Sequence, residues 1–134
     1  FSVTMTLGRF TGDAVVAKLG RPKVLPWGSA LAAAGYALVV LSPHWIGCLV
    51  GFALVGIGAA NVVPILFTAA GNQPDVPAHT ALAGATSLGY LGFLLGPAML
   101  GAVARAWGLS ASLLGVAGLL FLVGVASRRV LRSI

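Results

Sequence analysis

Five long apolar runs, separated by short polar connections, limit most strongly what this chain can fold into. They cover residues 1–19, 24–41, 45–70, 78–104 and 109–127. A helix needs about 20 mostly apolar residues to cross the hydrocarbon of a bilayer, and these runs are close to that length. Backbone amides in lipid must be hydrogen-bonded within the segment, and the short apolar/polar alternation of a membrane barrel is absent. The sequence therefore predicts an all-α, polytopic bundle of about five transmembrane helices.

The composition excludes a water-soluble globular fold. Hydrophobic residues make up 59% of the 134 residues and charged residues only 7%, against about 25% charged in an ordinary soluble domain. So few charges cannot supply the polar surface that a small soluble domain needs. The net charge of +6 comes without a basic stripe interleaved with aromatic residues. We therefore expect the lipid bilayer as a partner and no nucleic acid.

The distribution of Lys and Arg predicts the orientation. Seven of the eight basic residues lie near the first connection or after the last run: Arg9, Lys18, Arg21, Lys23, Arg128, Arg129 and Arg132. Four helices separate these two places, which puts them on one side of the membrane, with Arg105 opposite. Cytoplasmic segments carry the excess of Lys and Arg. We therefore expect an integral protein of the plasma (cell) membrane with a cytoplasmic C-terminus.

No catalytic constellation is visible in the sequence. The carboxylates Asp13 and Asp75 are far apart, and His44 and His79 are assigned to opposite sides of the membrane. A lone cysteine, Cys48, lies in an apolar run and is expected to pack as a small hydrophobe. We therefore expect no enzyme, no metal and no cofactor. Because the chain opens at Phe1 inside an apolar run, with no signal-peptide pattern, we also expect a fragment of a longer protein.

The end of the first run combines charge with a turn signal. Arg9 and Asp13 are four residues apart, so they share one helix face. An ionisable pair within a membrane segment indicates function by default, although a simple surface ion pair is the alternative to a latch on a partner helix. Gly20 is placed to end the first helix, and residues 20–23 are expected to form a basic tight turn.

The fourth run contains a proline among glycines. Pro97 lies between Gly92, Gly96 and Gly101. A proline removes one backbone hydrogen bond and clashes with the preceding turn, so we expect a bend there. The glycines leave room for a neighbouring backbone. Two interpretations stand: a static kink, or a close-packed seam between parts that move against each other.

Four residues are candidate contacts for a substrate. A buried amide without a partner costs several kcal/mol, so Asn61 either bonds a neighbouring helix or faces a wet cavity. Pro64 follows one turn later and should loosen the helix there. Tyr90 lies near the middle of the fourth run, close to Ser87, and its hydroxyl also needs a partner. We therefore predict a cavity contact for Asn61, Pro64, Tyr90 and Ser87.

These patterns carry a family resemblance. Residues 8–23 resemble the cytoplasmic-loop signature of the major facilitator superfamily (MFS), G-x-x-x-D-[RK]-x-G-[RK]-[RK]. Lys18, Gly20 and Arg21 match it in register, whereas Ala17 stands where the signature has Asp. The match is degenerate, as is usual for the copy of this motif in the second half of these transporters.

Two later stretches strengthen the resemblance. Gly92, Gly96, Pro97 and Gly101 match the G-x-x-x-G-P-x-x-G-G helix motif of the same superfamily. Residues 51–71 resemble the tenth helix of a bacterial branch that is sugar-permease-like or uncharacterised. Together the three stretches extend the resemblance over the whole chain. Their order, spacing and orientation make the resemblance fairly specific.

The resemblance implies helices eight to twelve of a twelve-helix secondary transporter of a small solute, working by alternating access. Its partners would be the N-terminal half of the same transporter and a small-molecule substrate, with Arg9, Asp13, Lys18, Gly20 and Arg21 in a gating loop. Run 45–70 would face the central cavity, and runs 24–41 and 109–127 would face lipid. Helices two to six remain an alternative register, because the loop motif also follows the second helix. The degenerate motif and the basic tail favour the C-terminal half.

Two other classes of membrane protein are alternatives to a transporter of this superfamily. A non-transporting scaffold or sensor module is the main alternative. A small four-helix multidrug exporter has a similar size, but it relies on a glutamate in the membrane, and this chain contains no Glu.

Overall fold

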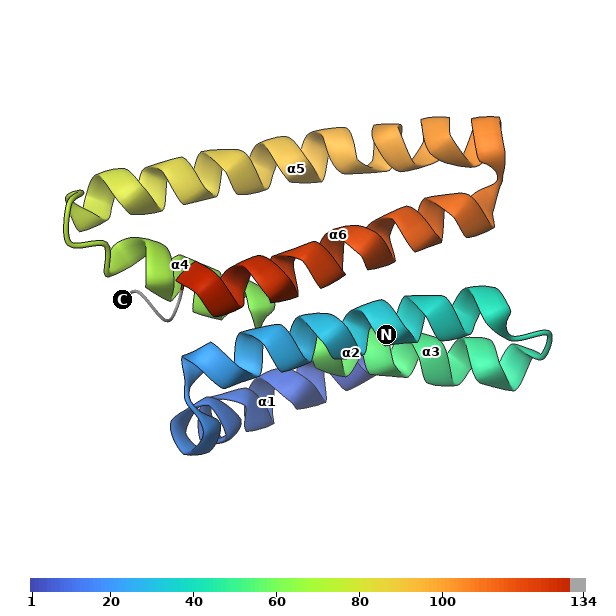
Figure 1. The fold of residues 1–134 in the computed structure, drawn as a ribbon, viewed down its shortest axis with the longest axis horizontal. Coiled ribbons are helices and arrows are strands. Elements are labelled where there is room, and N and C mark those ends of the chain that lie inside the picture. The colour runs from blue at the N-terminus through green and yellow to red at the C-terminus, as the bar shows by residue number, and fades with distance from the viewer. Residues whose placement is uncertain (131–134) are drawn as a thin grey trace. The chain divides into compact units, whose positions relative to one another are not determined.

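The computed structural model describes residues 1–130, apart from the side chains of Asp13, Arg129 and Val130. Figure 1 shows its helices: α1 (Ser2–Leu19), α2 (Arg21–Leu41), α3 (Trp45–Ala59), α4 (Val62–Gly71), α5 (Ala78–Trp107) and α6 (Leu109–Val130). No strand occurs among the described residues, and the all-α prediction is confirmed.

Four helical stretches are long and apolar enough to cross a membrane, which confirms a polytopic membrane protein. They are Arg21–Leu41, Trp45–Gly71, Ala78–Trp107 and Leu109–Arg128. The first predicted run is not among them: α1 has 18 residues, and Arg9, Asp13 and Lys18 fall within it.

Both tight turns are shorter than predicted. Each depends on one glycine in the left-handed region, Gly20 with φ 79° and Gly108 with φ 89°, where glycine has no Cβ to clash. Gly20 ends α1 as predicted. The predicted turn at 20–23 and the connection expected between the fourth and fifth runs, 105–108, are both too long. A proline is tolerated in the first turn of α2, and Arg105 suits the last turn of α5, where the helix dipole favours a cation.

The run 45–70 is broken near its middle. α3 ends at Ala59 and α4 begins at Val62, with Ala60 and Asn61 in a turn between them. Pro64 has no N–H to donate to the carbonyl of Ala60, one turn earlier. Ala60 itself keeps helical dihedral angles (φ −52°, ψ −40°), so hydrogen bonding is interrupted without a loop. The prediction that Pro64 loosens this helix is confirmed.

The chain divides into two compact units, which are described here one at a time. The first unit comprises Phe1–Val62 and Leu113–Ile134, and the second comprises Val63–Ser112.

Within the first unit, α2 and α3 are antiparallel and meet backbone to backbone. A Cβ built on Gly35 would lie 2.6 Å from the carbonyl oxygen of Gly51, and one built on Gly51 would lie 2.7 Å from that of Gly35. Gly28 and Gly58 form an equivalent pair two turns away. Ala32, between the pairs, is fully buried. Such close approach gives dispersion contacts along the seam, which drive helix association in lipid.

Two further helices pack on this pair. α1 runs parallel to α3, and a Cβ on Gly8 would lie 2.8 Å from the Cβ of Ala60. α6 approaches α2 through Gly124, whose built Cβ would lie 3.2 Å from the Cβ of Ser29. Ser29 is fully buried there. The first unit therefore joins its helices through small residues.

The second unit is held more loosely. Every residue of α5 remains at least partly exposed, and the helix runs unbroken across Pro97. The hydroxyl of Ser112, at the start of α6, donates to the carbonyl of Leu100 at 3.0 Å. Leu82 packs beside Gly71 at the end of α4.

Candidate functional site

A groove of about 280 Å³ lies between α1 and α2, with α3 at its floor; we call it the α1–α2 groove. Its lining is mostly apolar, and Thr11, Lys23 and Asn61 add polar groups. The lining residues are Gly8, Thr11, Val15, Leu19, Lys23, Val24, Trp27, Gly28, Leu31, Ile57, Gly58 and Asn61. On each of α1 and α2 these residues recur every three or four positions, so the groove follows the helix axes.

Asn61 lies where the helix break meets α1. A Cβ built on Gly12 would fall within 2.7 Å of the Asn61 Cγ and 2.8 Å of its Nδ2, so only glycine leaves room for this amide. Gly12 is buried, and Asn61 is half-buried. The contact places a polar side chain both against a neighbouring helix and in the wall of the α1–α2 groove.

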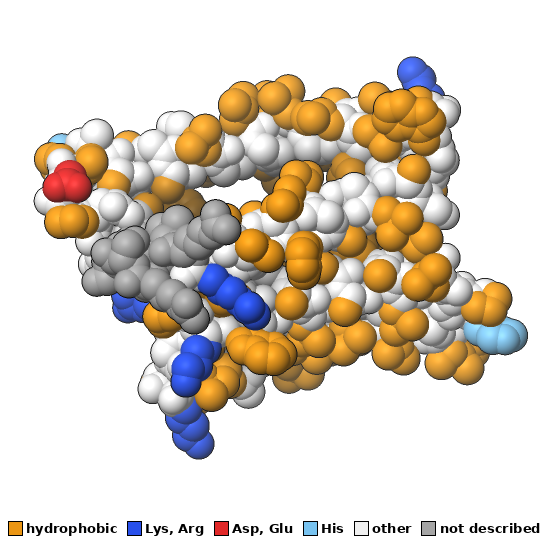
Figure 2. Space-filling view, in the orientation of Figure 1, with side chains coloured by type: hydrophobic (Ala, Val, Ile, Leu, Met, Phe, Trp, Pro, Cys, Tyr) orange, Lys and Arg blue, Asp and Glu red, His pale blue; other side chains and the backbone are white. Residues whose placement is uncertain are grey.

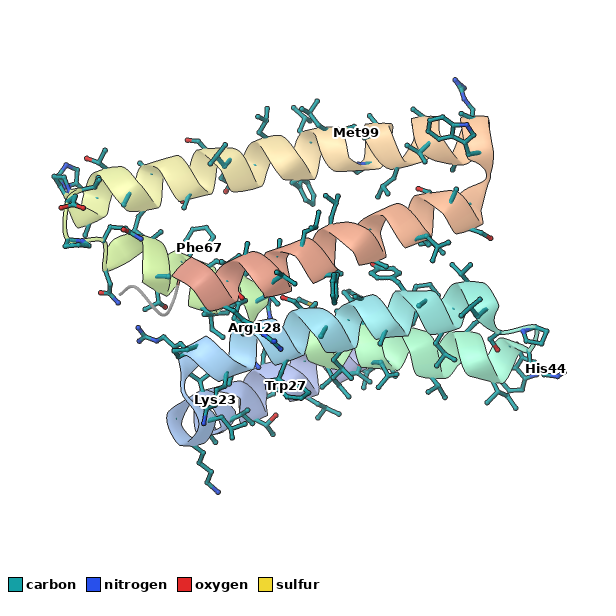
Figure 3. All side chains as sticks on the ribbon, viewed as in Figure 1. Lys23, Trp27, His44, Phe67, Met99 and Arg128 are labelled. Atoms are coloured by element: carbon teal, nitrogen blue, oxygen red, sulfur yellow. The ribbon has the colours of Figure 1, made fainter. Side chains whose placement is uncertain are left out.

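Tyr90 belongs to a different pocket, in the second unit. This α4–α5 pocket of about 340 Å³ is lined by Phe67, Thr86, Gly89, Tyr90 and Phe93. Figure 3 labels Phe67 on α4, which is shorter than α5. The faces of three aromatic rings attract apolar groups and organic cations.

The other two cavity candidates are outside the lining of this pocket. Ser87 is exposed on α5, and Pro64 lies on α4, where its carbonyl accepts the hydroxyl of Thr68 at 2.8 Å. Thus the structure groups Tyr90 with aromatic residues and Asn61 with Gly12, in separate units.

The loop-motif residues surround the turn between α1 and α2. Arg9, Lys18 and Arg21 are exposed, and Gly20 makes the turn itself. The side chain of Asp13 lies outside the described residues. Its pairing with Arg9 therefore stays a prediction, as does a gating role for this motif.

The packing-motif glycines on α5 meet no described neighbour. A Cβ built on Gly92, Gly96 or Gly101 would have no described atom within 4 Å, leaving aside the backbone of its own helix. Pro97, beside them, is exposed. Within the second unit, the described helices do not form the predicted seam.

A basic pocket of about 280 Å³ in the first unit was not foreseen. It is lined by Pro22, Lys23, Pro26, Trp27 and Arg128, from the start of α2 and the end of α6. Figure 3 shows Lys23, Trp27 and Arg128 near one another. Charge counting put both basic groups on one side, but it could not show that they share a cavity. The signal for that was Gly124, which brings α6 close to α2.

Metal binding has no support in the described part of the chain. No three His, Cys, Asp or Glu side chains gather there in a way that would hold a metal ion.

The relatives of the chain bear on its family. It is 48% identical over 132 residues to an uncharacterised MFS-type transporter of Yersinia pestis, a match covering 98% of this chain and 34% of that protein. It is 37% identical over 127 residues to the membrane protein MosC of Rhizobium meliloti, covering 95% and 31% respectively. The chain is thus similar over nearly its whole length to a protein named as an MFS-type transporter. The resemblance seen in its motifs is thereby confirmed.

A third relative is also named as a transporter. The chain is 33% identical over 106 residues to an uncharacterised transporter of Sinorhizobium fredii, covering 79% of this chain and 28% of that protein. The chain thus spans about a third of the length of the MFS-type and other relatives that it matches. No family model matches it, and no solved structure matches it.

Proposed function

We propose that this MFS-type chain forms helices eight to twelve of a secondary transporter that moves a small solute by alternating access. The observation that carries the proposal is its similarity, over 98% of its length, to one third of an MFS-type transporter. In such carriers two helical bundles rock about a site near the bilayer midplane.

The construction of the first unit supports a rigid moving body. The glycine pairs Gly28–Gly58 and Gly35–Gly51 lock α2 to α3, because neither backbone can approach more closely or slide without collision. A bundle that moves as one piece transmits a change at its core to both membrane faces. We assign this role to α1, α2 and α3.

The solute contacts in the proposal are Asn61, Pro64, Tyr90 and Ser87. The broken helix exposes a polar amide at Asn61, and irregular backbone in a membrane is tolerated where it is covered by protein or lines a cavity. The α4–α5 pocket adds Tyr90 with two other aromatic rings. The N-terminal half of the transporter would complete the cavity.

Flux through liposomes tests the proposal. The complete transporter, in which this chain is joined to its N-terminal half, is reconstituted around a trapped mixture of sugars, amino acids and organic cations, and the loss of each solute is followed by mass spectrometry. We expect faster loss of at least one solute than from protein-free liposomes, and slower loss with Asn61→Leu. Leu119→Ala, on an exposed position of α6, is the matched control and should behave as wild type.

The absence of solute flux would contradict the proposal. If no solute leaves faster than from protein-free liposomes, a non-transporting scaffold or sensor module becomes the better assignment. A gating role for Arg9, Asp13, Lys18, Gly20 and Arg21 would fall with it.

A further inference from the structure

Two cavities of the first unit are neighbours that share lining residues. Lys23 and Trp27 line both the basic pocket and the α1–α2 groove. The basic pocket adds Arg128, and the groove adds apolar side chains such as Val15, Leu19 and Leu31. A basic pocket therefore lies beside an apolar groove, and the two together suit an amphiphile better than a simple ion.

The excess of positive charge in the first unit favours binding of an anion in the basic pocket. The first unit contains seven of the eight Lys and Arg residues of the chain but only one of its two carboxylates, Asp13. Among the described residues, no carboxylate lines the basic pocket. In Figure 2, Lys and Arg side chains gather at the end of this unit where α1 turns into α2. Two cations around one cavity favour a phosphate group, which accepts charge-assisted hydrogen bonds from both.

The dimensions favour a lipid as the source of that phosphate. The α1 residues of the groove extend from Gly8 to Leu19, which is about 16 Å along a helix. One leaflet of the hydrocarbon core is about 15 Å deep, half of the full thickness. Trp27 is 70% exposed beside Lys23. Tryptophan and basic residues together mark the level of lipid headgroups.

We propose that this end of the first unit binds one anionic phospholipid, with its headgroup in the basic pocket and an acyl chain in the α1–α2 groove. Lys23 and Arg128 hold the phosphate, and Trp27 lies at the junction of headgroup and chain. This inference goes beyond the transport function and does not depend on it.

Lipid titration of the purified full chain tests the headgroup. Native mass spectrometry in neutral detergent counts bound dioleoylphosphatidylglycerol, with dioleoylphosphatidylcholine as the zwitterionic comparison. We expect the anionic lipid to bind about tenfold more tightly. Lys23→Gln with Arg128→Gln should weaken its binding about ten- to thirtyfold, since each basic residue near an anionic headgroup contributes about one factor of five.

Two control variants separate the site from general charge and from misfolding. Arg105→Gln removes the one basic residue that belongs to the second unit, and it should leave the lipid affinity unchanged. Lys23→Arg with Arg128→Lys keeps both charges and should bind as wild type. Equal binding of the two lipids, or an equal loss with Arg105→Gln, would overturn the proposal.

A groove-filling variant tests the acyl chain. Val15→Trp should weaken the binding of both lipids because the indole occupies the groove, whereas Val3→Trp, on an exposed position of α1 outside the groove, should not. Inorganic phosphate at millimolar concentration should fail to displace the lipid. If phosphate displaces it and Val15→Trp has no effect, the site takes free phosphate and the lipid assignment is wrong.

Discussion

Gly28 on α2 and Gly58 on α3 are in direct backbone contact. A Cβ built on Gly28 would lie 2.7 Å from the carbonyl oxygen of Gly58, and one built on Gly58 would lie 2.5 Å from that of Gly28. Real Cβ atoms do not approach an oxygen so closely, and a peptide carbonyl cannot rotate away as a side chain can. The two helices are therefore as close as their backbones permit at this point.

This contact predicts an unequal tolerance to added methyl groups. Gly58→Ala should destabilise the full chain by about 2 kcal/mol, because one backbone must move and the seam loses contacts along its length. Gly115→Ala, where a Cβ would meet no described neighbour, should be neutral or slightly stabilising. Thermal unfolding in detergent compares the two variants. Equal melting temperatures would contradict the seam.

The contact between Gly12 and Asn61 predicts an energetic coupling. Gly12→Ala should push the Asn61 amide out of its position, at a cost of about 1 to 2 kcal/mol. In an Asn61→Ala background the same change should cost much less, since the obstructing atoms are gone. A double-mutant cycle on thermal stability measures this difference. Additive effects would mean that the two residues do not constrain each other.

The α5 motif predicts a contact beyond the second unit. Gly96 and Gly115 are alike here, because neither would bring a Cβ within 4 Å of a described neighbour. If Gly96 lies against the N-terminal half, Gly96→Leu should lower both solute flux and thermal stability of the full chain. Gly115→Leu, expected to face lipid, should be tolerated. Equal tolerance at both positions would reduce the α5 motif to a coincidence of sequence.

The orientation can be tested with a cysteine near the C-terminus. Arg132 lies outside the described residues, but it belongs to the basic group assigned to the cytoplasm. In a Cys48→Ala background, Arg132→Cys should react with a membrane-impermeant thiol reagent only after the cells are opened. Reaction in intact cells would reverse the orientation and, with it, the assignment to helices eight to twelve.

Local sequence signals predicted the helices well but their partners poorly. Gly20 and Pro64 act on the backbone next to them, so the end of α1 and the break in the third run could be predicted from the sequence. The seam between α2 and α3 could not be predicted from the sequence. Its glycines are seven residues apart on each helix, which is wider than the four-residue spacing of the usual small-residue packing motif. Their match also depends on the register of two separate helices.

For the candidate sites too, the sequence indicated individual residues but not the residues that they contact. Asn61 and Tyr90 were singled out because a polar group in an apolar run needs a partner. That Gly12 receives Asn61, and that Phe67 and Phe93 accompany Tyr90, depends on which faces meet, and no single helix contains that information. Likewise, the count of basic residues placed Lys23 and Arg128 on one side, while their shared pocket depends on how α6 packs on α2.

Alternating access itself is tested most directly by labelling a cysteine from both sides of the membrane. Tyr90→Cys, in the complete transporter with its N-terminal half and with Cys48→Ala, is exposed to an impermeant thiol reagent in right-side-out and in inside-out vesicles. A thiol reacts as its thiolate, so labelling requires contact with water. Leu119→Cys, at an exposed, apolar position of α6, is the lipid-facing control. We predict that position 90 reacts from both sides and position 119 from neither. Reaction of position 90 from one side only, or from neither, would contradict alternating access through this cavity.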